Sequence, residues 1–321
     1  MFRSVRDLAI ATVVLLGGAL TAHAQDMEKV TIAIGQGGKW DASITELGIN
    51  KGIFKEHGLN AEILYTQGGG ETQQIVIAGS ADIGIAVGTQ GTMGAFGKGA
   101  PVRIIGSAAN GDDAFYFVKA DSPIQSMDDV NGGTLAYSRN GSSTHSFALG
   151  FVNLLGVDAE LVATGGPPST LTAVMSGQVD VGWSAPPFGL EQLQEGQIRM
   201  IATSRDLPSV KDHTVRLIIT NLRTLEERPQ VVEKFMDAYR ATIDWLYSGD
   251  EGLEAYAKLA NVSVDTARMV RDEFDTRDYV DPDKMLGVGD MMNQAVEFKF
   301  LDEPLSKEQL DELIMIDDWQ M

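Results

Sequence analysis

The chain has 321 residues, of which 44% are hydrophobic and 22% are charged, and its formal net charge is −20. These values are typical of a globular protein with room for two modest domains, and they exclude an intrinsically disordered chain. The acidic balance argues against nucleic acid and anionic lipid as partners. The absence of cysteine excludes disulfides, lipid attachment to a cysteine and cysteine-ligated metal sites.

The N-terminus has the pattern of an export signal. Two arginines precede an apolar run over residues 8–20, and residues 22–24 (AHA) fit the small-x-small cleavage pattern before Gln25. The apolar run is short for a membrane span, and polar sequence follows it directly. Residues 1–24 are therefore predicted to be a signal peptide that directs the protein to a bacterial periplasm. The alternative is an N-terminal anchor that stays uncleaved.

The rest of the chain alternates short apolar runs with helical patterns, which predicts an α/β protein. A first helix, 43–51, is expected to end at Gly52. Later helices are expected to begin near Ser126, at Pro229 and at the capping box that starts with Ser306. Strands are expected at residues 30–35, 61–65, 83–87, 102–108, 114–118, 135–138 and 215–220.

One stretch of the chain is echoed 98 positions later. Residues 68–84 (GGGETQQIVIAGSADIG) align with residues 166–182 (GPPSTLTAVMSGQVDVG), and Asp82 falls on Asp180. Each copy reads as a Gly-rich loop, a short amphipathic helix, a glycine that ends it and a strand that opens with Asp. Two such units predict two similar α/β lobes that face each other across a ligand cleft. The alternative is that the shared pattern of Gly and Asp at element ends is common in unrelated α/β proteins.

The run KGIFKEHGLNAE at residues 51–62 resembles a hallmark of one family. This family is the periplasmic solute-binding proteins of the nitrate/sulfonate/taurine uptake class, which includes the NMT1/THI5-like thiamine-precursor binders. The echoed segments and the helix after Pro229 resemble further segments of the same family, so the resemblance spans nearly the whole chain after residue 24. It implies a type II periplasmic binding protein fold, in which two α/β lobes joined by crossing hinge strands close on a small molecule.

The same resemblance implies a domain organisation and partners. Residues 25–112 and 215–321 are expected to form the first lobe, and residues 113–214 the second. The protein is expected to be a monomer that delivers its solute to an inner-membrane ABC permease with its ATPase, without a metal or cofactor. A periplasmic sensor input, which docks on a receptor instead, stays open as an alternative because both roles use the same closed form.

Four stretches of the chain are expected to face the cleft, because each follows the carboxyl end of a predicted strand. They are residues 36–41, 88–90, 138–145 and 183–188. They supply aromatic rings, hydroxyls, amides and cations, and the stretch 138–145 begins a helix whose free N–H groups favour an anion. The expected solute is therefore a small organic anion with an apolar or aromatic body, or a heterocycle. The candidate ligand-binding residues are Lys39, Trp40, Thr89, Gln90, Asn110, Ser138, Arg139, Gly141, Ser142, Ser143, His145, Trp183 and Pro186.

Several of these candidates also have a purely structural interpretation. Ser142 or Ser143 is suited to capping the following helix. Trp40 and Trp183 are large enough to serve as core residues of their lobes. Arg139 is free to face solvent or to pair with a surface carboxylate.

Outside the candidate list, four polar residues are expected to be structural. Asp82 and Asp180 are expected to hold their turns by hydrogen bonds to nearby backbone groups. His57 and His213 are expected at the surface, because they lie in polar connecting segments. His145 is the histidine whose place in the strand-to-helix junction makes a ligand contact worth testing.

The sequence offers little support for catalysis. It has no G-x-S-x-G nucleophile elbow, no phosphate-binding loop and no G-x-G-x-x-G after the first strand. Ser142 and His145 are close neighbours in the sequence, which is typical of a helix start and not of a catalytic triad. Pyrimidine synthases of the related fold carry a cysteine-rich motif, and menaquinone-pathway enzymes of this fold are cytoplasmic. The chain is therefore not expected to be an enzyme.

Overall fold

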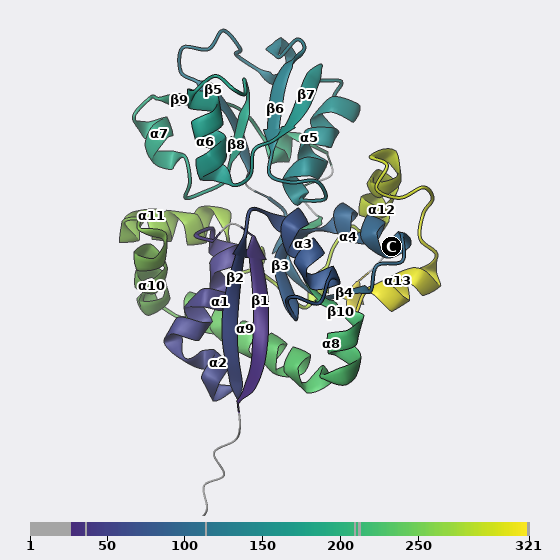
Figure 1. Cartoon of the computed structure of the whole chain (residues 1–321). Coiled ribbons are helices and arrows are strands. Elements are labelled where there is room, and N and C mark those ends of the chain that lie inside the picture. Colours follow the sequence, from purple (N-terminus) through teal and green to yellow (C-terminus); the bar gives the residue numbers. More distant parts are fainter. Residues whose placement is uncertain (1–26, 36, 113, 209, 211–212, 320–321) are drawn as a thin grey trace, which may run out of the picture.

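The computed structural model describes residues 27–35, 37–112, 114–208, 210 and 213–319, so the predicted signal peptide lies outside the described residues (Figure 1). The strands are β1 Glu28–Gly35, β2 Leu59–Thr66, β3 Ile83–Gly88, β4 Val102–Asn110, β5 Phe115–Lys119, β6 Gly133–Tyr137, β7 Ala159–Ala163, β8 Gly182–Ser184, β9 Ile198–Thr203, β10 Thr214–Asn221, β11 Lys284–Met285 and β12 Asp318–Trp319. The α-helices are α1 Trp40–Lys51, α2 Ile53–Glu56, α3 Gly69–Ile77, α4 Thr89–Gly97, α5 Ser143–Asn153, α6 Pro167–Met175, α7 Leu190–Gln194, α8 Leu222–Glu227, α9 Pro229–Tyr247, α10 Asp250–Ala260, α11 Val264–Met269, α12 Val288–Glu297 and α13 Lys307–Leu313.

The strands form two lobes with the same internal order, one above the other in Figure 1. The sheet of the first lobe has the order β2-β1-β3-β10-β4, in which β10 runs antiparallel to both of its neighbours. In the second lobe β7 pairs with β6, and β5 lies between β8 and β9. A bridge between Leu135 and Val181 joins these two parts, which gives the order β7-β6-β8-β5-β9. This is the two-lobed periplasmic binding protein fold that the sequence predicts.

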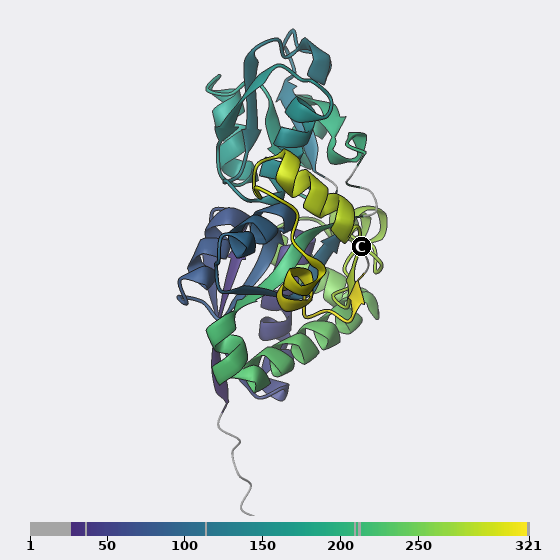
Figure 2. The same cartoon turned by 90° about the vertical axis from the view of Figure 1, so that its right-hand side faces the viewer.

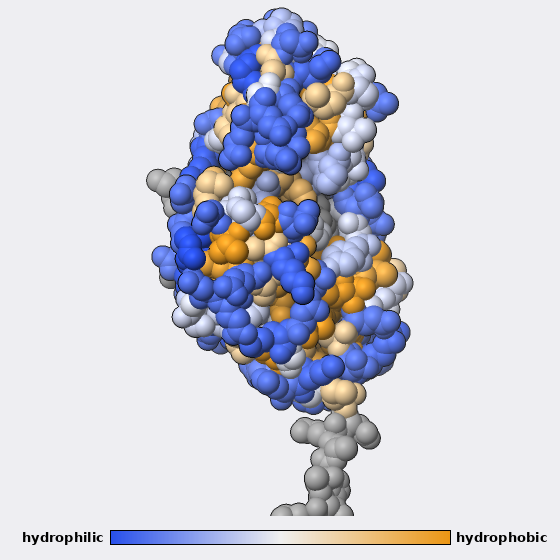
Figure 3. All heavy atoms as spheres, turned by 90° about the vertical axis from the view of Figure 1, so that its left-hand side faces the viewer, coloured by the Kyte–Doolittle hydropathy of each residue, from blue (hydrophilic) through white to orange (hydrophobic). Residues whose placement is uncertain are grey.

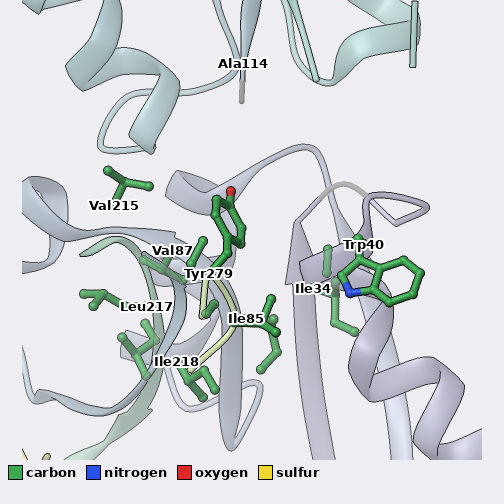
Figure 4. Packing of buried hydrophobic residues seen from close by; sticks show 14 of the residues in the cluster. Ile34, Trp40, Ile85, Val87, Ala114, Val215, Leu217, Ile218 and Tyr279 are labelled. Carbon is green, nitrogen blue, oxygen red and sulfur yellow. The ribbon is translucent and has the colours of Figure 1, made fainter. Parts of the chain in front are cut away.

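Strands β3, β4 and β10 of the first lobe are almost wholly buried because helices cover both faces of the sheet, whereas the edge strand β2 is partly exposed. Every residue of β10 is buried, and Figure 4 shows Leu217 and Ile218 of this strand beside Ile85 and Val87 of β3. The long helix α9 begins with Pro229 and packs against α1. Its buried face includes the apolar residues that the helical spacing predicts, namely Val232, Phe235, Tyr239, Thr242 and Leu246.

The sequence echo is a structural repeat. Helices α3 and α6 occupy equivalent places in the two lobes, and the hydroxyls around them match as well. The Oγ1 atoms of Thr66 and Thr72 are 2.7 Å apart, and those of Thr164 and Thr170 are 2.6 Å apart. Each of these pairs lies 98 positions from the other in the sequence. The structural match therefore favours a true repeat over a coincidental pattern of Gly and Asp at element ends.

The aspartates of the echo have partners that the sequence did not predict. Both were expected to hold their own turns. Instead, Asp82 accepts a hydrogen bond from the backbone N–H of Thr31 on β1 at 2.9 Å, and Asp180 accepts one from Thr134 on β6 at 2.8 Å. The correction has a simple cause: a parallel neighbouring strand brings an N–H group to the start of β3 and of β8. Each carboxylate therefore fixes one strand against another.

The chain passes between the lobes twice, before β5 and before β10. The two crossing segments touch, because the backbone N–H of Gly111 donates to the carbonyl of His213 at 2.8 Å. Strands β5 to β9 belong to the second lobe and β10 returns to the first, while the exact lobe boundaries stay a prediction. Figure 2 shows α12 lying across the level at which the lobes meet. None of the helices in the described part of the chain combines the length and apolar character that a membrane span requires.

Candidate functional site

A narrow cavity, here called the inner cavity, lies between the lobes near the carboxyl ends of β1, β3 and β6. In this closed arrangement its lining nearly fills it, and the free volume of about 10 Å³ is room for about one water molecule. The first lobe contributes charged groups to its lining, and the second lobe contributes hydroxyls. The residues used below are Lys39, Asp41 and Arg216 from the first lobe and Ser138, Ser142, Ser143 and Thr144 from the second. A solute bound here would contact both lobes at once, and the lobes would have to separate to admit it.

The charged side of the inner cavity is a buried network. The Nε atom of Arg216 is 3.1 Å from Oδ2 of Asp41, and its Nη2 atom donates to Asp112. The same Nη2 atom donates to the hydroxyl of Tyr279 at 2.8 Å. Lys39 Nζ donates to that hydroxyl at 3.3 Å and lies 3.8 Å from Asp41 Oδ1. We refer to Lys39, Asp41, Asp112, Arg216 and Tyr279 as the buried charge cluster.

Burial and charge pairing determine the ionisation of this cluster. Burial opposes the charge on Arg216, but the carboxylates of Asp112 and Asp41 outweigh it and raise the pKa of Arg216 well above its usual value. Burial raises the pKa of Tyr279, so that its hydroxyl stays protonated. Figure 4 shows this hydroxyl directed toward the second lobe. Arg216 therefore stays charged at the cavity wall, and Tyr279 behind it stays a neutral phenol.

The hydroxyl side of the inner cavity is formed by the junction between β6 and α5. The hydroxyls of Ser138, Ser142 and Thr144 form a triangle with O–O distances of 2.9 to 3.0 Å. Ser142 caps α5 by accepting the backbone N–H of His145 at 3.2 Å. Each hydroxyl has one hydrogen to donate, and the three O–O contacts use all three hydrogens within the triangle. The main role of the triangle is therefore to shape the junction. The sequence-based capping interpretation of Ser142 is confirmed, and Ser143 follows it as the first residue of α5.

His145 is held inside the junction and does not reach solvent freely. Its Nδ1 atom accepts the backbone N–H of Gly141 at 3.2 Å, and its ring stacks on Tyr137 with centroids 4.5 Å apart. The edge of Phe300, from the segment after α12, lies 5.4 Å away. Burial lowers the pKa of His145 to about 4, so the imidazole is neutral at ordinary pH. His145 therefore joins the second lobe to the C-terminal segment that follows α12.

The two lobes approach each other backbone to backbone. A Cβ atom at Gly91 would lie 2.1 Å from the carbonyl oxygen of Gly141, and one at Gly88 would lie 2.6 Å from the same atom. No side chain fits between chain segments this close. The glycines of α4 and of the β3 end thus permit the closed arrangement of the lobes, and Gly141 takes part through its backbone.

A second, larger hollow lies nearer the surface and is here called the outer groove. It opens between α6 and α7 of the second lobe and the turn between α10 and α11, with an empty volume of about 1250 Å³ including open solvent. Apolar side chains such as Phe117, Leu171 and Phe188 dominate its lining, and Glu191 is the charged residue among the described ones. Figure 3 faces this side of the molecule and shows apolar residues gathered in its middle. The larger hollow thus mixes apolar and mostly uncharged polar groups, and the smaller one is charged.

Both predicted tryptophans are core residues in this structure. Trp40 is fully buried as the first residue of α1, and its ring packs edge-on against Tyr256 and Tyr247 with centroids 4.6 and 5.8 Å away. Trp183 is buried in β8. The interpretation of both as core packing fits these positions better than solute stacking does. Pro186, just after β8, is also buried and does not line the inner cavity.

The remaining candidates bond mainly within the first lobe or point away from the inner cavity. Thr89 donates to the carbonyl of Thr214, and Gln90 donates to the side chain of Gln294 on α12 at 3.1 Å. Asn110 donates to the carbonyl of Asp281 at 3.2 Å. Arg139 is half-buried, donates to the carbonyl of Ser138 at 3.2 Å and is not part of the inner-cavity lining. Their contact with a solute stays a prediction.

Sequence reasoning missed most of the buried charge cluster, although signals were present. Arg216 is the one charged residue in the apolar strand 215–220, and a charge in such a run requires a buried partner. Asp112 lies between two predicted strands, 102–108 and 114–118, and Asp41 belongs to the stretch 36–41 that the sequence assigned to the cleft. His213, expected at the surface, is instead 9% exposed, and its Nε2 atom lies 3.3 Å from Asp290. Packing of the α12 region over the second crossing segment explains this burial.

Comparisons with known proteins agree with this architecture. The alkanesulfonate-binding protein SsuA from Xanthomonas axonopodis pv. citri, bound to MOPS, is 15% identical, with 89% of this chain and 97% of that chain covered and a TM-score of 0.70. The periplasmic nitrate-binding protein NrtA from Synechocystis PCC 6803 is 13% identical, with coverages of 91% and 87% and a TM-score of 0.70. The desulfurization enzyme DSZB is 16% identical, with coverages of 90% and 97% and a TM-score of 0.61.

At these identities the likeness shows the fold alone. A search of curated proteins found no match. The sequence model described as NMT1/THI5 like matches residues 45–251, which is well over half of the chain. It includes both echoed segments, the second lobe and all of the helix that begins at Pro229. The chain therefore belongs to the NMT1/THI5-like family.

Proposed function

We propose that the chain is the solute-binding component of an ABC importer and captures a small organic anion between its two lobes by hinge closure. The observation that carries this proposal is the inner cavity, whose lining combines cations of the first lobe with hydroxyls of the second. A solute that touches both lobes binds the closed form more tightly than the open one and shifts the population toward it. The solved relatives SsuA and NrtA bind an alkanesulfonate and nitrate, respectively.

The two hollows suggest how such a solute is placed. The charged inner cavity suits a small polar head group, and the outer groove offers room for an apolar or aromatic body. Phe188 of the outer groove packs against Gly38, where a Cβ atom would be 2.9 Å from its ring. Gly38 directly precedes Lys39, so one short loop contacts both spaces. A sulfonate or carboxylate with an organic body fits this arrangement, and a neutral heterocycle is the other class that the sequence left open.

The cellular setting follows from the same role. A cleaved signal peptide over residues 1–24 would deliver the protein to the periplasm, where a monomer would dock on an inner-membrane permease that works with an ATPase. The expectation that the chain is not an enzyme agrees with its membership of a family that includes solute binders. The enzyme DSZB shares the fold, so turnover of a bound solute is the observation that would reverse this expectation.

A thermal-shift screen tests the proposal. The protein is exported to a bacterial periplasm, purified, unfolded and refolded to remove any carried-over solute. The panel contains sulfonates, carboxylates, nitrate, bicarbonate and pyrimidines. A solute present at a hundred times its dissociation constant stabilises the protein by about 2.7 kcal/mol, which is a readable rise in Tm. A hit is then followed by small-angle scattering, which should show a smaller radius of gyration on binding. A flat panel would contradict the proposal, and so would an unchanged radius of gyration with a saturating hit.

A further inference from the structure

The inner cavity holds balanced charges, and this balance has a consequence for the solute. Lys39 and Arg216 are the cations of the buried charge cluster, and Asp41 and Asp112 are its carboxylates. All four side chains are at least nine-tenths buried. Resting on the function proposed above, we propose that Asp41 sets the charge of the accepted head group: the inner cavity takes a head group with one negative charge and rejects a dianion.

The first part of the argument is electrostatic. Two carboxylates already neutralise the two cations, and the buried carboxylate of Asp275 adds negative potential at Arg216. Within the cluster and Asp275, three carboxylates face two cations, so no positive charge is left over for a bound anion. The remaining attraction comes from the N-terminus of α5, which lines the cavity with Ser143 and Thr144. A helix N-terminus carries roughly half a positive charge, which favours a monoanion but cannot compensate a dianion.

The second part concerns the place of Asp41 itself. Asp41 lies in the first turn of α1, where its Oδ1 atom accepts the backbone N–H of Ala42 at 2.9 Å. The N-terminus of α1 therefore already holds an internal anion. A bound dianion would sit beside this carboxylate in a space that largely excludes water. Juxtaposed like charges cost several kcal/mol in such a setting, and that cost separates monoanions from dianions.

The third part is an observation that points to a missing partner. Oδ2 of Asp41 and Nε of Arg216 form an ion pair, but neither atom makes a hydrogen bond among the described residues. Both residues line the inner cavity and are buried. Buried polar atoms normally have hydrogen-bond partners, so a bound group is expected to complete them. A head group that accepts a hydrogen bond from Nε of Arg216 supplies one missing partner. A head group with its own O–H can also donate a hydrogen bond to Oδ2 of Asp41.

Two probes with the same body and different head charge test the proposal. Benzenesulfonate is a monoanion throughout the pH range 5 to 8. Phenyl phosphate is mostly a dianion at pH 8 and a monoanion at pH 5, because the second pKa of a phosphate ester is about 6. Calorimetric titration of the wild-type protein should give at least about tenfold tighter binding of benzenesulfonate at pH 8, which corresponds to about 1.4 kcal/mol. Between pH 8 and pH 5 the affinity for phenyl phosphate should rise about tenfold, while that for benzenesulfonate changes little.

The titratable side chains near Asp41 are not expected to obscure the result of this pH series. Lys39 and Arg216 contact it, and the phenols of Tyr239, Tyr256 and Tyr279 are near. Burial raises the pKa of all three tyrosines, so these phenols stay neutral between pH 5 and 8. His145 is also neutral there, because burial lowers its pKa to about 4. The phosphate of the probe is therefore the group expected to dominate the series.

A variant and its control complete the experiment. Asp41→Asn should lower the ratio of the affinity for benzenesulfonate to that for phenyl phosphate at pH 8 by about tenfold, because it removes one carboxylate beside the head group. Asp180→Asn, which removes a carboxylate far from the inner cavity, should keep the wild-type preference. The pH series uses the wild-type protein alone, so the proposal remains testable even where Asp41→Asn does not fold.

The outcomes separate this proposal from the proposed function. Equal affinity of the wild-type protein for both probes at pH 8 overturns the charge rule, and so does an unchanged preference in a folded Asp41→Asn variant. Binding of neither probe also overturns it, since a single-charged sulfonate should be accepted. In each of these cases the solute-binding function stands if any solute of the wider panel stabilises the protein. Failure of that whole panel contradicts the function itself.

Discussion

Arg216 and Asp112 form a buried ion pair that joins the two crossings between the lobes. Arg216 lies on the returning strand β10, and Asp112 lies on the outgoing crossing segment. Asp112 also accepts the backbone N–H of Ala114 at 2.5 Å and lies 3.4 Å from the hydroxyl of Ser204 in the second lobe. Because Arg216 also contacts Asp41, the hinge and the proposed solute site share one side chain.

The first prediction concerns the stability contributed by this pair. Arg216→Met should lower the free energy of unfolding by about 3–5 kcal/mol, because it leaves the carboxylates of Asp112 and Asp41 buried without their cation. Urea denaturation measures the change. Lys29→Met is the control, since Lys29 pairs with Glu62 at 2.8 Å on the exposed surface. This control should leave the denaturation midpoint nearly unchanged. Similar midpoints for the two variants would show that the buried pair does not stabilise the fold.

The second prediction concerns closure of the lobes. Gly91→Ala adds a Cβ atom that would lie 2.1 Å from the carbonyl oxygen of Gly141, while alanine suits the helix α4 in which it stands. We expect the first lobe to fold normally and the closed form to be disfavoured. The apparent dissociation constant should rise at least about tenfold as the closed population falls, and the scattering radius should stay large with solute. Gly249→Ala is the control, because a Cβ there meets nothing within 4 Å.

The third prediction is a pH dependence of stability that originates at His145. Its pKa is about 4 in the folded protein, below the ordinary value of 6.5, so the unfolded chain binds more protons between these two values. Stability is therefore fully present above pH 6.5 and is lost as the pH falls toward 4. The loss should be about 2–3 kcal/mol. Urea denaturation at pH 7 and pH 4.5 measures it, and His145→Asn should show a smaller loss than the wild-type protein. Equal losses would assign the pH dependence to other groups.

The fourth prediction distinguishes the two cations near the site. Lys39→Gln should weaken binding of an organic anion by about 1.5–3 kcal/mol, as expected for the loss of a charge-assisted hydrogen bond. Lys39 is 2% exposed and lines the inner cavity. Arg139→Ala tests the sequence-based expectation that Arg139 meets the solute. Since Arg139 lies outside that lining, its variant should show a smaller loss in the same titration. A larger loss for Arg139→Ala would move the anion toward the mouth of the cleft.

The fifth prediction concerns the outer groove. Phe188→Ala removes an aromatic wall of the groove, so it should weaken binding of benzenesulfonate by about tenfold, or about 1.4 kcal/mol. Methanesulfonate has no body to place in the groove and should be affected less. Competition titrations with the two sulfonates measure the difference. Equal losses for both would show that Phe188 acts on the closed form as a whole and not on the body of the solute.

Local features of the sequence predicted the elements well. The capping box at Ser306, the first-turn Pro229 and the helix end at Gly52 are all confirmed. These signals are local because their hydrogen bonds lie within a few residues. One boundary was wrong for a non-local reason. The first helix starts at Trp40 and not at residue 43, because the tryptophan packs against Tyr256 and Tyr247, which lie far away in the sequence.

The candidate site was predicted only in part. The loops that follow β1 and β6 do meet at the inner cavity, since the carboxyl ends of the parallel strands in each lobe face the other lobe. Which side chains point into that space could not be predicted. Gln90 follows β3 as expected, yet its amide turns to Gln294, because α12 from the end of the chain packs there. Arg216 entered the site from a strand that the sequence treated as plain core.

The sequence by itself determined the two-lobed α/β fold and the repeat within it, because apolar periodicity, caps and glycine stops act over short distances. It also determined the cleft, because strand order fixes which loops meet. Only the tertiary structure decided the chemistry of the cleft. The partners of Arg216, namely Asp41 and Asp112, lie 175 and 104 positions away in the sequence. A charge buried at such a distance from its partners is stabilised by their positions in space, which local sequence patterns do not encode.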